Sequence, residues 1–79
     1  MDMVKILTSI IETKGKVKFT LYSLNYVIEK KDEKFVIYPE LYLGKSTREY
    51  QSINELLENY KIYNENIMDN IYKISRIEE

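Results

Sequence analysis

Apolar residues first recur along the chain at the spacing of one face of a helix. Over residues 2–14 the apolar positions follow this spacing, and they are Met3, Ile6, Leu7, Ile10 and Ile11. Asp2 stands where a helix N-cap is preferred, and Gly15 stands where a left-handed C-terminal cap is preferred. The pattern therefore predicts an N-terminal helix that ends at Gly15.

After Gly15 the period changes to that of β-strands. Four segments predict strands, and they are 17–21, 26–30, 35–38 and the short run 48–51. The polar stretch 31–34 predicts the turn between the second and third strands. Pro39 marks an edge or a bulge, so that residues 41–43 either extend the third strand or begin a bend.

A helical period returns beyond residue 51. Ser52 and Glu55 form a capping box, and the buried stripe of the helix that follows is Ile53, Leu56, Leu57 and Tyr60. A break at 61–63 and an N-cap at Asn64 predict a last helix, with one side made of Ile67, Ile71, Ile74 and Ile77. The chain is thus predicted to be one α+β domain over residues 1–79: an N-terminal helix, an antiparallel meander of three to four strands and two C-terminal helices.

Hairpin register decides which strand side chains share a face of the sheet. With two-residue loops at 24–25 and 32–33, Leu21 and Ile37 both lie opposite Ile28, and the two hairpins agree on their faces. A three-residue first loop would break this agreement, so we prefer the pairing with two-residue loops. It predicts a core face formed by Phe19, Leu21, Ile28, Phe35 and Ile37.

The opposite face is predicted to have an apolar and aromatic centre. Its candidate interaction residues are Tyr22, Val27, Val36, Tyr38 and Tyr42. Left open, they would form a patch typical of a partner surface or a homodimer seam. The alternative is that a helix covers them, or that they are ordinary cross-strand pairs on a solvated face.

Composition adds mainly exclusions. The 79 residues include no Cys and no His, which excludes disulfides and thiolate metal sites and removes the commonest general base. The carboxylates are scattered and form no convergent pair. Gly44, Lys45 and Ser46 are similar to the end of a phosphate-binding loop, but Pro39 stands where the pattern needs its first glycine. We therefore expect no enzyme, no cofactor and no metal.

Charge bears on the choice of partner. The net charge is −1, yet residues 1–48 carry nine Lys/Arg against six Asp/Glu and residues 49–79 carry three against seven. Lys18, Lys31 and Lys34 near the predicted tyrosines suggest an alternative, a single-stranded nucleic-acid site. The sequence pI near 5.5 argues against it, because phosphate binding draws on a basic excess. No apolar run is long enough to span a membrane, and cytoplasm is the expected compartment.

The stretch from Tyr26 to Ile74 resembles a type of small uncharacterised α+β protein from low-GC Gram-positive bacteria and their phages. The elements concerned are the hairpin 26–38, the helix 52–60 and the closing segment 67–74. The resemblance implies a phage or mobile-element origin, where very small cytoplasmic proteins often occlude a host protein such as a defence nuclease. We thus expect a non-enzymatic protein–protein interaction module. The alternatives are a nucleic-acid-binding module and a homodimeric structural protein.

Overall fold

The structure is a computed structural model that describes residues 2–42 and 47–78, with the backbone alone at Tyr42. Its N-terminal helix is the one that the sequence predicts. α1 (Met3–Lys14) begins after Asp2, whose carboxylate accepts hydrogen bonds from the amides of Val4 at 3.0 Å and Lys5 at 3.4 Å. It ends at Gly15, which has φ of 86° and donates its N–H to the Ile11 carbonyl at 2.8 Å. The positive φ explains the glycine, because it has no Cβ to clash there.

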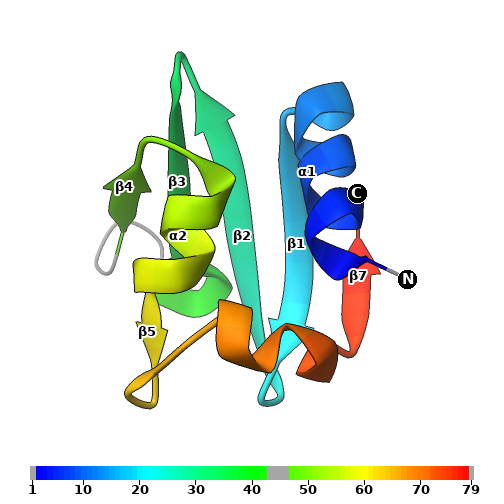
Figure 1. Ribbon diagram of the computed structural model, residues 1–79, viewed down its shortest axis with the longest axis vertical. Coiled ribbons are helices and arrows are strands. Elements are labelled where there is room, and N and C mark those ends of the chain that lie inside the picture. The colour runs from blue at the N-terminus through cyan, green and yellow to red at the C-terminus, as the bar shows by residue number, and fades with distance from the viewer. Residues whose placement is uncertain (1, 43–46, 79) are drawn as a thin grey trace.

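A five-stranded antiparallel sheet follows, with the order β4-β3-β2-β1-β7 (Figure 1). Its strands are β1 (Lys16–Leu21), β2 (Leu24–Lys31), β3 (Lys34–Pro39), β4 (Arg48–Tyr50) and β7 (Arg76–Glu78). The first four form the predicted meander. After Pro39 the chain bends into the short 3-10 helix η1 (Glu40–Tyr42), so the third strand is not extended.

The register of the second hairpin is as predicted, and that of the first is not. Ile28 pairs with Ile37 across β2 and β3, as expected. Between β1 and β2 the loop is Tyr22–Ser23, so that Leu21 pairs with Leu24 and Ile28 pairs with Val17. The predicted loop at 24–25 is therefore wrong by two residues. An even shift leaves every strand side chain on its predicted face.

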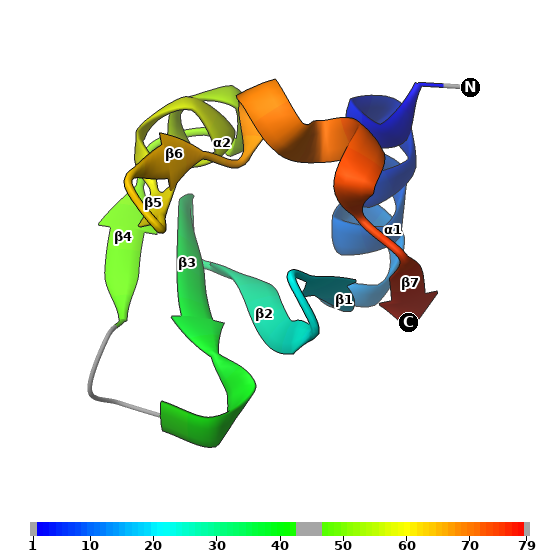
Figure 2. The same ribbon diagram turned by 90° about the horizontal axis from the view of Figure 1, so that it is seen from below.

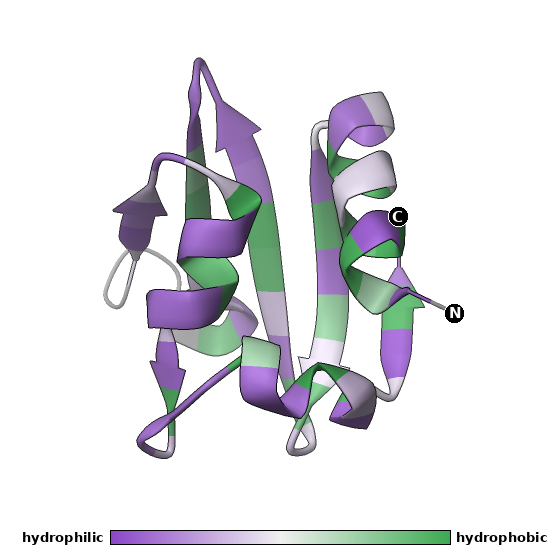
Figure 3. Ribbon diagram, viewed as in Figure 1, coloured by the Kyte–Doolittle hydropathy of each residue, from purple (hydrophilic) through white to green (hydrophobic). Residues whose placement is uncertain are grey.

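Among the described residues, the longer helical elements cover one face of the sheet, and the short η1 lies on the other side (Figure 2). α1, α2 (Ile53–Asn59) and the 3-10 helix η2 (Met68–Lys73) all lie on the same side (Figure 2). The alternating hydropathy of the strands, clear along β1 in Figure 3, turns the apolar residues toward these helices. The core beneath them contains Leu7, Ile11, Phe19, Leu21, Ile28, Ile37, Leu56, Leu57 and Ile67, each no more than 1% exposed.

The first of the two predicted C-terminal helices is confirmed. The Ser52 hydroxyl accepts the amide of Glu55 at 3.1 Å, and the predicted stripe of Ile53, Leu56, Leu57 and Tyr60 is buried. The second is wrong. In its place lie a small hairpin of β5 (Lys61–Ile62) and β6 (Glu65–Asn66), then η2 and then β7.

Local and long-range causes explain the lost helix. The side-chain oxygen of Asn66 accepts a hydrogen bond from the backbone amide of Asp69 at 2.7 Å. The backbone carbonyl of Asn66 accepts one from the side-chain amide of Asn70 at 3.3 Å. Such bonds compete with regular helical ones. Arg76 to Glu78 instead form β7, which pairs with the free edge of β1. Ile67 and Ile74 are still buried, so the predicted apolar side was right although the helix was not.

Candidate interaction surface

The side of the sheet that faces away from α1, α2 and η2 is the candidate surface, and we call it the outer face. The strand registers place Lys16, Lys18, Val27, Glu29, Val36 and Tyr38 on it. At the edges, Glu49 of β4 lies opposite Val36 and Glu78 of β7 lies opposite Lys18. The outer face therefore has a small apolar centre and a border of both charges.

Three of the predicted patch residues meet at that centre. Val27 pairs directly with Tyr38, and Val36 lies beside them on β3. Val27 is only 9% exposed and Val36 only 4%, although α1, α2 and η2 all lie on the other side of the sheet. Long side chains on neighbouring strands, such as those of Lys18 and Glu29, can cover valines with their aliphatic stems. The accessible part of the centre is thus the Tyr38 ring and the space beside it.

The other two predicted tyrosines do not join this centre. Tyr22 lies in the β1–β2 turn, where its ring contacts that of Tyr63 with 5.5 Å between the centroids. The predicted first loop at 24–25 would place Tyr22 opposite Val27. The turn lies two residues earlier, so this placement is wrong and Lys18 lies opposite Val27 instead. The side chain of Tyr42 lies outside the described residues, as do Gly44, Lys45 and Ser46.

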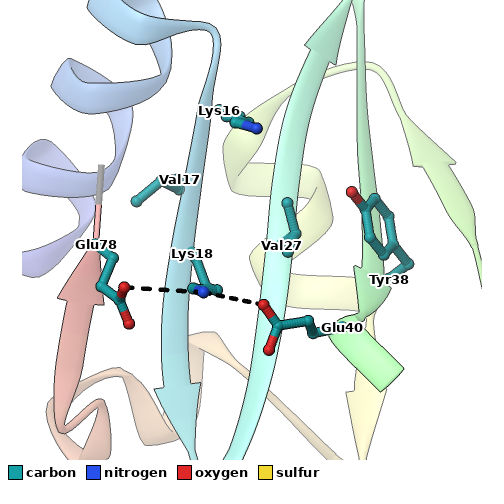
Figure 4. Close-up of a pocket in the computed structure, with 7 residues that line it drawn as sticks. All are labelled: Lys16, Val17, Lys18, Val27, Tyr38, Glu40 and Glu78. Atoms are coloured by element: carbon teal, nitrogen blue, oxygen red, sulfur yellow. Dashed lines mark hydrogen bonds and ion pairs between the residues drawn. The ribbon is translucent and has the colours of Figure 1, made fainter. Parts of the chain in front are cut away.

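A hollow of about 350 Å³ opens on the outer face between β1 and β3 (Figure 4). Val27 and Tyr38 supply its apolar and aromatic lining, Lys16 lies at one end, and Lys18 and Glu40 lie at the other. The Tyr38 hydroxyl donates to Glu29 at 3.3 Å, which fixes the direction of the ring. The hollow is large enough for one long or aromatic side chain of a partner.

Glu40 closes one end of the hollow through a hydrogen-bond network. It accepts from the Lys18 ammonium at 2.9 Å and from the Asn25 amide at 3.1 Å, and Asn25 accepts the Thr20 hydroxyl at 2.6 Å. Glu78 lies on the other side of Lys18, 3.8 Å from the ammonium. This network connects η1, which carries Glu40, to three strands of the sheet and holds the rim in place.

The cations of the predicted nucleic-acid alternative are all paired with carboxylates. Lys18 lies between Glu40 and Glu78, Lys31 lies 4.0 Å from Glu29, and Lys34 lies 3.6 Å from Glu49. A phosphate backbone would have to compete with these carboxylates for each ammonium group. The geometry thus gives no support to a nucleic-acid site built on these three lysines.

Because of the Lys18–Glu40 pair, we predict that the stability of the folded state decreases at acid pH. The hydrogen bond from Lys18, followed by that from Asn25, lowers the pKa of Glu40 below its ordinary value of 4.5, and the same pair raises the pKa of Lys18. A carboxyl whose pKa is lowered on folding favours the folded state above its ordinary pKa. This contribution is lost as the pH falls through the pKa of the folded state.

The measurement is a titration of the Glu40 carboxyl carbon by NMR in the folded chain. We expect a midpoint below 4.5 and a rise toward that value in the Lys18→Met variant, which keeps the aliphatic stem and removes the charge. An unchanged midpoint in the variant would contradict the pairing.

Comparisons with known proteins add no relationship: no family model, curated protein or solved structure matches the chain. Within residues 2–42 and 47–78, no three His, Cys, Asp or Glu side chains are grouped so that they could hold a metal ion. Nor does this part of the chain contain a helix long and apolar enough to cross a membrane.

The sequence pattern did not reveal the ion pairs that form the rim. Lys18 and Glu40 are 22 residues apart, and their contact depends on the bend at η1. Glu78 reaches the outer face only because β7 pairs with β1. The predicted C-terminal helix would have excluded this pairing. Strict alternation around Ile77 could have suggested a strand there, but three residues give a weak signal.

Proposed function

We propose that the chain is a non-enzymatic protein–protein interaction module that binds its partner through the outer face. One observation carries the proposal. All the longer helical elements lie on one side of the sheet, which leaves the other side with a side-chain-sized hollow inside a charged border (Figures 2 and 4). An apolar centre with a polar rim is the usual anatomy of a protein interface.

The residues of this face have distinct roles in the proposal. Tyr38 and Val27 receive an apolar or aromatic side chain of the partner in the hollow. Lys16 provides the cation at the open end, where no described carboxylate lies within 4.0 Å of its ammonium. Lys18 and Glu40 stabilise each other and keep the rim ordered before binding. A preordered rim lowers the entropy lost on association.

The mode of action that we propose is occlusion of a host protein. It rests on the resemblance of residues 26–74 to small phage and bacterial proteins, and on the open face that such a protein needs. A small inhibitor can act by covering a functional surface, and it then needs no catalytic groups of its own. A defence nuclease of the host is one such target.

A second copy of the chain is the alternative occupant of the outer face. Sizing chromatography over a range of concentrations separates the two. A monomer at high micromolar concentration supports a different partner, whereas a concentration-dependent dimer that the Tyr38→Ala variant abolishes would replace the proposal with self-association.

The test of the proposal is affinity capture from a host-cell lysate with matched variants. Lys16→Glu and Lys5→Glu make the same charge change, but Lys16 lies on the outer face and Lys5 is exposed on α1, across the sheet. We expect the wild type and the Lys5→Glu variant to capture a protein that the Lys16→Glu and Tyr38→Ala variants do not capture.

The opposite pattern would overturn the proposal. If both outer-face variants, shown to be folded by circular dichroism, retain every protein that the wild type captures, the outer face is not the binding surface. A protein lost by Lys5→Glu alone would place the interaction on α1.

A further inference from the structure

A second hollow, of about 390 Å³, lies at the β4 edge of the sheet, where β4, the end of α2 and the start of β5 come together (Figure 1). We call it the edge hollow. It lies on the helical side of the sheet, because Arg48 and Tyr50 pair with Ile37 and Phe35 and so share the core face with them. All of its lining side chains can form hydrogen bonds, and they are Arg48, Tyr50, Asn59, Tyr60 and Lys61.

The end of α2 brings three of these residues together. Tyr60 is the C-cap of α2, and its φ of −73° and ψ of 123° turn the chain out of the helix and into β5. Asn59 and Lys61 flank it on either side of this turn. Two carbonyls at this end of α2, whose partial negative charge would oppose an anion, are occupied. The side chain of Asn59 donates to that of Glu55 at 2.8 Å, and the amide of Tyr60 donates to that of Leu56 at 2.9 Å.

Tyr60 is a buried side chain whose hydroxyl is left for a ligand. It is 9% exposed, and its ring meets that of Tyr26 edge to face with 6.4 Å between the centroids. Within residues 2–42 and 47–78, Tyr38 is the one tyrosine whose hydroxyl forms a hydrogen bond, and the Tyr22 hydroxyl is the one buried polar side-chain atom without a partner. The unpaired hydroxyl of Tyr60 is therefore not enclosed, and it opens into the edge hollow that Tyr60 lines.

The two tyrosines of the edge hollow keep their protons at neutral pH. Burial raises the pKa of Tyr50 and that of Tyr60 above the ordinary value of 10.0, and the charge of Arg48 opposes this rise only in part. Each hydroxyl can therefore donate a hydrogen bond. Because the charge of Arg48 acts on both hydroxyls, its guanidinium lies on their side of β4, where it also donates to the Thr47 carbonyl at 3.3 Å.

The edge hollow carries more positive than negative charge. Arg48 and Lys61 line it, and no described carboxylate lies within 4.0 Å of either cation. Glu65 belongs to the same small hairpin as Lys61 but lies on its opposite face. The negative charge of Glu55 reaches the Tyr50 hydroxyl, but Glu55 does not line the edge hollow. Two cations and two hydroxyl donors are thus available to one anion.

We propose that the edge hollow binds the phosphate group of a phosphate monoester. Such a group has a charge of about −1.5 to −2 at neutral pH and three oxygens that accept hydrogen bonds. Arg48 and Lys61 supply the opposite charge, while the hydroxyls of Tyr50 and Tyr60 donate to the phosphate oxygens. A carboxylate has only two oxygens and a single charge, so it would leave some of these donors unused. The edge hollow is larger than a phosphate group, which leaves room for the group that carries the phosphate.

A single phosphate suits this part of the chain better than a nucleic-acid strand. Residues 49–79, which include Lys61, carry three Lys/Arg against seven Asp/Glu. A strand needs cations along its backbone, and its affinity depends on how many phosphates they neutralise. The acidic half of the chain would repel the further phosphates of a strand, whereas a monoester needs only the two cations of the edge hollow.

The test is an NMR titration of the labelled chain with inorganic phosphate at neutral pH and constant ionic strength. We expect the amide signals of residues 48–50 and 59–61 to shift, while those of Val27 and Tyr38 on the outer face stay in place. Arg48→Gln should weaken binding about ten-fold or more, because a charge-assisted hydrogen bond is lost. Tyr60→Phe keeps the buried ring and removes only the hydroxyl, and it should weaken binding about five-fold.

Arg76→Gln is the matched control. Arg76 is an exposed arginine of β7, the strand at the opposite edge of the sheet, so the same charge is removed far from the edge hollow. We expect this variant to bind phosphate as the wild type does. Glycerol phosphate and a short peptide that contains phosphoserine are titrated in the same way. The tighter binder shows whether the monoester is a small molecule or a phosphorylated protein segment, and binding of either supports the proposal.

Four results would overturn the proposal. They are an absence of shifts at millimolar phosphate, equal weakening by Arg48→Gln and Arg76→Gln, unchanged binding by Tyr60→Phe, and binding of acetate as tight as that of phosphate. The second would reflect overall charge, and the last would make the edge hollow a general anion site. The edge hollow and the outer face lie on opposite sides of the sheet and are tested with separate variants, so either proposal can fail while the other stands.

Discussion

Replacing Phe19 with alanine is expected to lower the free energy of unfolding by about 3–5 kcal/mol. Phe19 lies in the middle of β1, is 1% exposed and stacks on Tyr26 with 5.7 Å between ring centroids. Its removal leaves a cavity between the sheet and the helices. For a domain of this size that loss is a large part of the total free energy of unfolding.

Urea denaturation followed by circular dichroism measures this effect. Leu24→Ala, on the same hairpin but 38% exposed, is the control and should change the free energy of unfolding by less than about 1 kcal/mol. Equal effects of the two substitutions would mean that Phe19 is not buried in the core as the structure places it.

Replacing Ile67 with alanine has the second largest expected effect, a loss of about 2–5 kcal/mol. Ile67 is fully buried and lies between β6 and η2, in the segment whose structure differs most from the sequence prediction. The substitution therefore tests whether this segment, which is not a regular helix, is nevertheless anchored in the core.

The matched control in that segment is Tyr72→Ala, which removes an exposed ring and should change stability by less than about 1 kcal/mol. Thermal unfolding of both variants compares them directly. Similar melting temperatures for Ile67→Ala and the wild type would show that the C-terminal segment contributes little to the core.

The faces of the sheet could be predicted from the sequence because strand periodicity survives an even shift in register. The predicted partner of Leu21 is Ile28 and the observed partner is Leu24, yet both of these partners lie on the core face. Only the turn itself was misplaced. The turn consists of Tyr22 and Ser23, and neither is the glycine or asparagine that usually marks a type I′ turn. The sequence therefore does not indicate where the turn lies.

The C-terminal segment could not be predicted because its structure depends on distant parts of the chain. Its isoleucines recur at helical spacing, but residues 76–78 form backbone hydrogen bonds with the edge of β1 instead of continuing a helix. The same holds for the contact between the rings of Tyr22 and Tyr63, which belong to two turns far apart in the sequence. Periodicity records which side of an element is apolar, and it says little about which elements meet.

The central claim, that a partner protein binds the outer face, is tested most directly by valine methyl NMR. The chain has four valines, of which Val27 and Val36 lie on the outer face and Val4 lies on α1. With the captured partner added, we predict that the methyl signals of Val27 and Val36 shift and that those of Val4 stay in place. A shift of Val4 with Val27 and Val36 unchanged would contradict the claim.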